Sequence, residues 1–424
     1  MKVKKIGVRI SCALVALSFV AVSTARAAEH AHRHGAKEPA VGGVVSLDVC
    51  ADGNILHLLT ALRGPNEGGE TNARPRLRYE RSDDGGTTWS APVELGEGQP
   101  ATIAKRGMDA QVAAAGEKIV AVWPTAGSDK MGRGPMATAF SADGGRTWRA
   151  GKNPADDNLT IGHSFIDVAA DEAGVFHLVW LDSREGGAKG LRYARSRDGG
   201  ATWSRNQTLD ANACECCWNV LQTSVGGGVA VLYRDAEPRD MAVVRSDDGG
   251  ESWGPPVRVG RFNWDITACP HVGGALVMMP PRLSESSGAV VAAARDEAAH
   301  ALVWTAKDGD VHGVYALNSA DGGRRWDEPR RVGMPAASRP DLCATADGRL
   351  VAVWDADGEG GRGIYVASSK DRGRNWSEPK RLSDLDAFAT HGRLVGTEAG
   401  VRAFWTEMRA GERTQWASRP VSPK

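Results

Sequence analysis

The chain has 424 residues, of which 42% are hydrophobic and 25% are charged, and this composition excludes an intrinsically disordered protein. Lysine plus arginine equals aspartate plus glutamate at 52 each, a balance that argues against a nucleic-acid partner. The 52 glycines and 20 prolines exceed the usual share and predict a fold with many turns.

The N-terminal segment resembles a secretory signal peptide. Basic residues precede the apolar stretch 10–22, and Ala25, Arg26 and Ala27 fit a small-x-small cleavage site. We therefore predict a signal peptide over residues 1–27 and a periplasmic or secreted protein. No later stretch has 18 apolar residues, so we expect no membrane span after cleavage.

Residues 28–43 are expected to form a histidine-bearing tail and a closing strand. Cleavage after Ala27 would make His30 the third residue of the mature chain. A free amine, two backbone amides and this imidazole suit Cu(II) or Ni(II) in a square-planar nitrogen set. The alternative is a solvated tail whose histidines are there by chance.

One octet recurs along the rest of the chain. It first appears as Ser-Asp-Asp-Gly-Gly-Thr-Thr-Trp at 82–89 and returns at 141–148, 196–203, 246–253, 319–326 and, in a worn form, at 369–376. A period of 50 to 73 residues is typical of a propeller or a solenoid. The aspartate and the glycine pair are the residues of a hairpin turn, so we expect the octets to brace turns.

Short apolar strands surround each octet and indicate four strands per repeat. Radially arranged four-stranded sheets form a β-propeller, which makes residues 44–424 a single all-β propeller domain. A seventh apolar strand ends at Trp405 and no octet follows it. We expect residues near 40–45 to supply the missing fourth strand and close seven blades, with six blades as the alternative.

The octets resemble the Asp boxes, or BNR repeats, of the sialidase superfamily over nearly the whole predicted mature chain. The resemblance implies a propeller, and the superfamily includes exo-sialidases, other glycosidases and non-catalytic proteins. A sialidase of this type needs three arginines for the substrate carboxylate, a tyrosine nucleophile paired with a glutamate, and an acid/base aspartate. The Arg-Ile-Pro signature is missing from the segment 44–50.

Tyr233 is the one tyrosine that does not precede an octet directly in the third strand of a repeat. The resemblance therefore makes Tyr233 the candidate nucleophile, with Glu215 as its partner and Arg234 beside it. If the protein is an enzyme, the expected activity is that of a glycoside hydrolase of the exo-α-sialidase type.

In a propeller the innermost strands all start at one face, around the central axis. Soft and basic side chains gather just before or within these strands: Cys214, Cys216, Cys217, Cys269, His271, His163 and His391. Thiolates with imidazole suit Cu(I) or Zn(II), so these residues are candidate ligands for copper or zinc. Disulfide pairing, for example of Cys269 with one of the three clustered cysteines, and a free reactive thiol are the alternatives.

Charged residues at the same face are candidate ligand-binding groups. They are Asp109, Asp167 and Asp341 near the starts of innermost strands, and Arg239 and Asp240 on the loop that follows Tyr233. The alternative for the loop residues is a local ion-pair network that holds the loop.

Three functions are compatible with the sequence: a ligand- or metal-binding propeller that works without turnover, a glycosidase that acts on acidic sugars, and a non-catalytic interaction scaffold. The expected partner is a small molecule, a glycan or a metal ion, and the expected state is a monomer.

Overall fold

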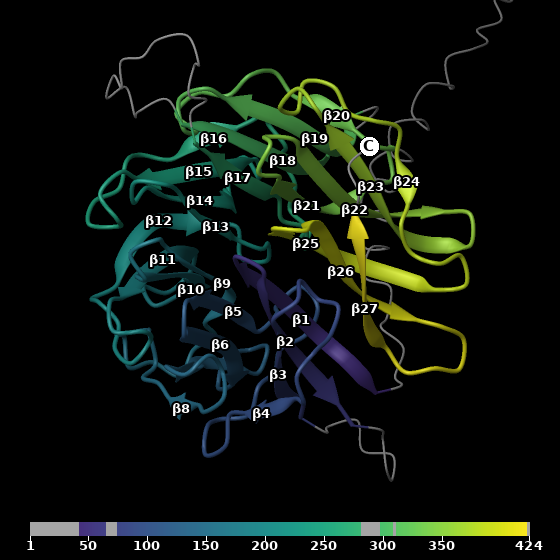
Figure 1. The fold of residues 1–424 in the computed structure, drawn as a ribbon. Coiled ribbons are helices and arrows are strands. Elements are labelled where there is room, and N and C mark those ends of the chain that lie inside the picture. Colours follow the sequence, from purple (N-terminus) through teal and green to yellow (C-terminus); the bar gives the residue numbers. More distant parts are fainter. Residues whose placement is uncertain (1–41, 65–73, 281–296, 308–310, 422–424) are drawn as a thin grey trace, which may run out of the picture. The chain divides into compact units, whose positions relative to one another are not determined.

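The computed structural model describes residues 42–64, 74–280, 297–307 and 311–421. Seven antiparallel sheets follow one another along the chain and surround a common axis, which forms a seven-bladed β-propeller (Figure 1). The predicted signal peptide, most of the tail and His30 lie outside the described residues. The described part contains no helix suited to crossing a bilayer.

Each blade runs from an innermost strand at the axis to an outermost strand at the rim, and the first six blades have four strands. Blades 1 to 3 are β1 (Gly43–Asp52), β2 (Ile55–Arg63), β3 (Arg76–Ser82), β4 (Val93–Leu95); β5 (Gln111–Ala115), β6 (Lys118–Ala126), β7 (Arg133–Ser141), β8 (Arg149–Ala150); and β9 (Ser164–Ala170), β10 (Phe176–Asp182), β11 (Lys189–Ser196), β12 (Gln207–Ala213).

Blades 4 to 7 continue the same order. They are β13 (Val220–Thr223), β14 (Val229–Arg234), β15 (Met241–Ser246), β16 (Val257–Val259); β17 (Ala275–Met279), β18 (Ala298–Ala306), β19 (His312–Ser319), β20 (Arg330–Val332); β21 (Ser338–Ala344), β22 (Leu350–Gly358), β23 (Gly361–Ser369), β24 (Lys380–Arg381); and β25 (Phe388–Thr397), β26 (Gly400–Met408), β27 (Gln415–Val421).

The octets are turns that leave the third strand of each blade, as their composition predicts. In the third blade, the Ser196 hydroxyl donates to Asp198 Oδ1 (2.8 Å), and Asp198 also accepts the Thr202 amide (2.9 Å) and hydroxyl (2.6 Å). Since the third strand runs parallel to the innermost strand, these turns lie at the end of the blade opposite to where the innermost strands start. The octets and the predicted site therefore occupy opposite faces of the ring.

Replacing Asp198 by alanine is expected to lower the free energy of unfolding by about 1–2 kcal/mol, because two hydroxyl donors and one amide lose their acceptor. Urea denaturation measures this loss. The Glu172→Ala variant, which changes an exposed acidic residue of the same blade, is the control and should stay within about 0.5 kcal/mol of the wild type. Equal stabilities of the two variants would contradict the bracing role of the aspartate.

Apolar side chains fill the space between adjacent blades. One buried cluster spans each of the seven interfaces among the described residues. Tryptophans of the second strands are fully buried in these clusters: Trp123, Trp180, Trp304, Trp354 and Trp405. The propeller is therefore a ring of face-to-face sheet contacts in which every blade depends on two neighbours.

The ring closes in a different way from the one expected. Blade 7 has three strands among the described residues, and residues 43–45 begin the innermost strand of blade 1 instead of adding a fourth strand to blade 7. A single bridge joins Gly43 to Thr414, and the Val44 amide donates to the Thr414 carbonyl (2.8 Å). Closure rests mainly on a buried cluster in which Leu47 and Leu56 of blade 1 pack with Phe404 of blade 7.

One register position of the innermost strand lines the axis in six of the seven blades. In blades 1 to 4, 6 and 7 these positions are Asp48, Gln111, Asp167, Val220, Asp341 and Arg393. The five polar members, Asp48, Gln111, Asp167, Asp341 and Arg393, are called the axial cluster below.

The carboxylates of the axial cluster cap the open edges of neighbouring innermost strands. Asp48 accepts the Val112 amide (2.8 Å) and Asp341 accepts the Leu394 amide (2.7 Å), each from the next blade. Because an innermost strand has no partner on its axial side, its amide groups need such acceptors. The axial cluster therefore links consecutive blades through backbone hydrogen bonds.

Candidate metal centre

Two loops on the face where the innermost strands start bring four cysteines and a histidine together. Cys214, Cys216 and Cys217 lie on the loop between β12 and β13, and Cys269 and His271 lie on the loop between β16 and β17. These five residues are called the cysteine cluster below. The chain segments are more than 50 residues apart, and only the packing of blade 4 against its neighbours joins them.

The sulfur atoms of the cysteine cluster lie at short distances. Cys214 Sγ is 3.5 Å from Cys216 Sγ and 3.8 Å from Cys217 Sγ. The donor atoms of Cys214, Cys216 and Cys217 all lie within 4.8 Å of one another, and the same holds for Cys216, Cys269 and His271. All of these cysteines are free thiols in the structure. Because the sulfurs of Cys216 and Cys269 lie within 4.8 Å of each other, a disulfide between these two cysteines is sterically accessible.

The three clustered cysteines are buried, whereas Cys269 is half-buried and His271 is exposed. Hydrogen bonds with Cys214 and Cys217, together with burial, raise the pKa of Cys216. Burial opposes ionisation of Cys217, but the thiols of Cys214 and Cys216 and the charge of Arg234 hold its pKa well below the usual value. The lowered pKa of Cys217 favours its thiolate form, which is the form that binds metal.

Arginine side chains add positive charge next to the sulfurs. Arg239 Nη1 donates to Cys214 Sγ (3.1 Å). Arg234 is buried, stacks on the Trp264 ring at 5.3 Å, and donates to the carbonyls of Val272 and Trp304. Arg234 therefore fixes the loop that carries His271 while its charge stabilises a nearby thiolate.

The loop between β14 and β15 holds the β16–β17 loop of the cysteine cluster in place. Asp240 is buried and accepts the amides of Asn263 (2.9 Å) and Trp264 (3.1 Å), and the Arg239 amide donates to the Trp264 carbonyl (2.8 Å). Asp240 thus holds the β16–β17 loop. Of the two residues that the sequence assigned to ligand binding here, Arg239 touches the cluster and Asp240 braces the backbone.

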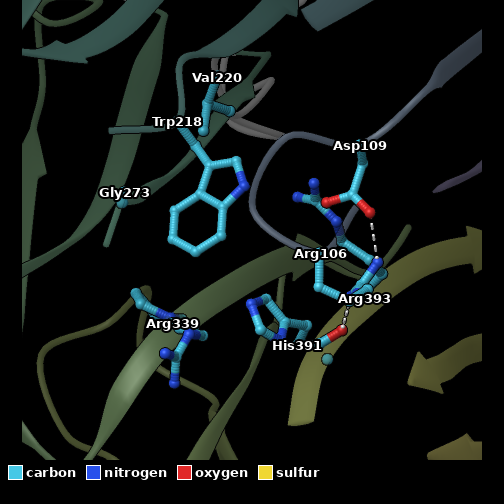
Figure 2. A pocket seen from close by; sticks show the side chains of 11 residues that line it. Arg106, Asp109, Trp218, Val220, Gly273, Arg339, His391 and Arg393 are labelled. Carbon is cyan, nitrogen blue, oxygen red and sulfur yellow. Dashed lines mark hydrogen bonds and ion pairs between the residues drawn. The ribbon is translucent and has the colours of Figure 1, made fainter. Parts of the chain in front are cut away.

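A cavity of about 30 Å³ lies among Arg106, Trp218 and His391 (Figure 2). Trp218, which follows Cys217 in the chain, forms one wall, and its ring meets the His391 ring edge-on at 5.6 Å. Gly273 forms part of the same wall, and a Cβ atom there would lie 2.8 Å from Trp218 Cβ. This cavity, called the central pocket below, accommodates a water molecule or a small ion.

Arginines surround the central pocket, and each has an acidic neighbour. Arg106 Nη1 lies 2.9 Å from Asp109 Oδ1, and Arg339 Nη1 lies 3.0 Å from Asp355 Oδ2. Arg393 interacts electrostatically with the aspartates of the axial cluster and with Asp109. The wall of the pocket thus carries three arginines and one carboxylate, Asp109, and the partners of Arg339 and Arg393 include carboxylates outside the wall.

His391 lies deep in the central pocket and is electrically neutral. Burial, reinforced by the charges of Arg339, Arg106 and Arg393, holds the pKa of His391 well below its usual value. Its backbone carbonyl accepts Arg106 Nη2 (2.6 Å). The structure brings His391 to the same face as the cysteine cluster but places its ring against Trp218, outside the two sulfur-containing donor groups.

Strained backbone marks this face of the ring. Phe165, His271, Arg339 and His391 have positive φ angles of 54°, 52°, 51° and 59°. Left-handed backbone is unfavourable for residues with a Cβ atom, so the surrounding structure must enforce it. Three of these residues stand two positions before an axial residue, where the strands enter the ring through irregular pairing.

The aspartates assigned to ligand binding lie at the axis and serve as acceptors. Asp109 accepts the Leu47 amide (3.1 Å) and Asp167 accepts the Leu221 amide (2.6 Å). Asp341 caps Leu394, as described above. Each of these three carboxylates accepts a backbone amide of an adjacent blade, and Asp109 also pairs with the Arg106 side chain.

The predicted metal ligand His163 lies away from the cysteine cluster. His163 Nε2 bonds to Asp157 Oδ2 (2.9 Å), in a separate group with Asp182 in which Arg184 forms ion pairs with both carboxylates. His163 therefore does not join the cysteine cluster. His163 lies at the start of blade 3, whereas the loop with Cys214, Cys216 and Cys217 leads into blade 4, and this difference separates them.

The candidate catalytic trio is not assembled. The Tyr233 hydroxyl donates to Asp210 and is buried between blades 3 and 4, while Glu215 lies beside Cys269 Sγ at 3.6 Å. Burial and the Asp210 carboxylate raise the pKa of Tyr233 above its usual value, which disfavours a nucleophilic phenolate. Arg234 serves the loop contacts already described.

Sequence reasoning missed Trp218, Arg106 and Arg339 as residues of the central pocket. A signal was present for two of them. Trp218 and Arg339 stand two positions before the axial residues Val220 and Asp341, as His391 does before Arg393. Aligning the innermost strands of the repeats by this register would have found them.

The profile of the BNR repeat-like domain matches residues 24–259, more than half of the chain. This chain belongs to the BNR repeat-like domain family. Four of the six octets lie within the matched residues, and the predicted BNR-repeat relationship is thereby confirmed. No curated protein sequence is significantly similar to this BNR-repeat propeller.

Solved structures share the fold of the BNR-repeat propeller at low sequence identity. A PL25 polysaccharide lyase, an ulvan lyase, is 10% identical with a TM-score of 0.53 over 90% of this chain and 96% of its own. A protein of unknown function from Dyadobacter fermentans is 14% identical, with a TM-score of 0.49 over 78% and 95%. A Trypanosoma rangeli sialidase in complex with the inhibitor DANA is 11% identical, with a TM-score of 0.46 over 78% and 56%.

Proposed function

We propose that this propeller binds a soft metal ion, copper(I) in the first place, through the cysteine cluster on the face where the innermost strands start. The observation that carries the proposal is the convergence of three buried sulfurs with Cys269 and His271 from a separate loop. Thiolate ligands select Cu(I) and Zn(II) over harder ions. Three sulfurs in one buried group suit three-coordinate Cu(I), whereas structural zinc is almost always four-coordinate.

Binding of Cu(I) by the reduced full-length protein is the expected result. In a competition titration against a Cu(I) chelator under anaerobic conditions, the Cys216→Ser/Cys217→Ser variant should bind more than 100-fold more weakly, since even outer partners of ligands contribute 10–100-fold. Cys343→Ser is the matched control and should bind as the wild type does, because Cys343 lies on β21 of blade 6. A parallel titration with Zn(II) identifies the preferred metal.

Thiols are counted by mass spectrometry before each titration, so that a disulfide is recognised as such. A fully reduced wild type that competes for Cu(I) no better than the double variant would overturn the proposal. The proposal would also be overturned if Cys214, Cys216, Cys217 and Cys269 of the native protein form disulfides that mild reductants do not reduce. That result would support the alternative of structural disulfides.

A further inference from the structure

The two donor groups of the cysteine cluster share one atom. Cys216 Sγ belongs to the buried group with Cys214 and Cys217 and also to the outer group with Cys269 and His271. No larger group of donors in the described part of the chain meets the same 4.8 Å limit, so the five donors do not converge on one centre.

The distances within the buried group fit a single ion. A metal 2.3 Å from each of three sulfurs in a trigonal plane places these sulfurs about 4.0 Å apart. The Cys214–Cys216 and Cys214–Cys217 separations of 3.5 Å and 3.8 Å are close to this spacing. Cys269 and His271 share only Cys216 with this buried group, so they remain as donors for a second ion.

We propose that the cysteine cluster holds two soft metal ions bridged by the Cys216 thiolate, an inner ion bound by Cys214 and Cys217 and an outer ion bound by Cys269 and His271. This inference rests on the proposed function and specifies it. Each thiol gives its proton to solvent as it becomes a ligand, and no redox step is involved.

Charge balance favours two monovalent ions. Four thiolates carry four negative charges, and Arg239 and Arg234 supply two positive charges next to Cys214 and Cys217. Two Cu(I) ions complete neutrality, whereas two divalent ions would leave a net positive charge in a buried site, which is unfavourable. The Glu215 carboxylate, 3.6 Å from Cys269 Sγ, lies at the exposed rim of the outer group.

The difference in burial gives the two ions different roles. Cys214, Cys216 and Cys217 are 2%, 4% and 1% exposed, so the inner ion has no direct contact with solvent. His271 is exposed and Cys269 is half-buried, which makes the outer position the one that exchanges metal with an external donor or acceptor. The bridging sulfur provides a route from the outer to the inner position.

Metal stoichiometry tests the inference on the full-length chain. Native mass spectrometry of the reduced, Cu(I)-saturated protein should show two ions in the wild type and in the Cys343→Ser control. The Cys217→Ser and Cys269→Ser variants should each retain one ion, and Cys216→Ser should bind both ions at least tenfold more weakly. X-ray absorption of the wild type should contain a copper–copper scattering contribution that Cys269→Ser lacks.

The wild-type measurements need no variant, so misfolding of a variant cannot decide the outcome. One ion per chain in the wild type, unchanged in Cys269→Ser and without copper–copper scattering, would overturn the bridged pair and leave the proposed function intact. A wild type that binds no Cu(I) would overturn both. Circular dichroism of each variant shows that the propeller is folded before the ions are counted.

Discussion

Replacing Arg393 by methionine is expected to lower the free energy of unfolding by about 3 kcal/mol at pH 8. Arg393 is the basic member of the axial cluster, and Asp48, Asp167 and Asp341 are the acidic ones. Without the guanidinium group, these three carboxylates lose the positive charge that they share. The figure is at the lower end for buried ion pairs, because Arg393, Asp167 and Asp341 keep partial exposure to water along the axis.

The loss should shrink at pH 5. Burial raises the pKa of Asp48 to about 6 and that of Asp167 to about 7, so both are mostly protonated at pH 5 and need less compensation. Urea denaturation at the two pH values measures the difference. Arg325→Met, which changes a side chain that is 92% exposed, is the control and should change stability by less than about 0.5 kcal/mol. An equal loss from Arg393→Met at pH 5 and pH 8 would contradict an electrostatic origin.

Replacing Asp167 by asparagine is expected to stabilise the protein above pH 7. The folded-state pKa of about 7 lies above the ordinary value of 3.8, mainly through burial, so the folded protein binds this proton more tightly than the unfolded chain. The wild type therefore loses stability at Asp167 as pH rises from about 4 to about 7 and loses no more beyond that. Asparagine keeps an acceptor for the Leu221 amide and never ionises.

The gain should reach about 1–4 kcal/mol at pH 8, since one pKa unit corresponds to about 1.4 kcal/mol and channel water weakens the effect. It should fade towards pH 4. The quantity to compare at each pH is the free energy of unfolding of the variant minus that of the wild type. This difference removes the contribution of buried histidines such as His57, whose pKa is lowered to about 4 and which change stability in the opposite direction over the same range. Asp265→Asn, at an exposed site, should show no trend with pH. A destabilised Asp167→Asn at pH 8 would show that ionised Asp167 contributes to the fold.

The local chemistry of the repeats made most of the fold predictable. The octets determine their own turns through contacts within eight residues, as the Ser196, Asp198 and Thr202 bonds show. Ring topology then predicts that the loop 214–217 and the loop 269–271 lie at a common face. Both inferences needed only short-range patterns and one rule about where innermost strands begin.

Contacts between blades could not be predicted from the sequence. The partner of Tyr233 is Asp210 on the outermost strand of the preceding blade, and no spacing rule identifies it. The same holds for the Arg106 bond to the His391 carbonyl, which joins blades 2 and 7. The closing strand was misplaced for a related reason, because apolar packing of Leu47 and Leu56 on Phe404 replaces most of the backbone pairing expected there.

The order of residues around the axis has a consequence for synthesis. The acidic groups arrive with blades 1, 3 and 6, and the guanidinium group that offsets them arrives with blade 7. A nascent chain that had emerged only as far as β24 would carry three mutually repelling carboxylates and no counter-ion. Premature closure into a smaller ring is thus electrostatically penalised, and the last sheet to be made completes the charge balance of the whole circle.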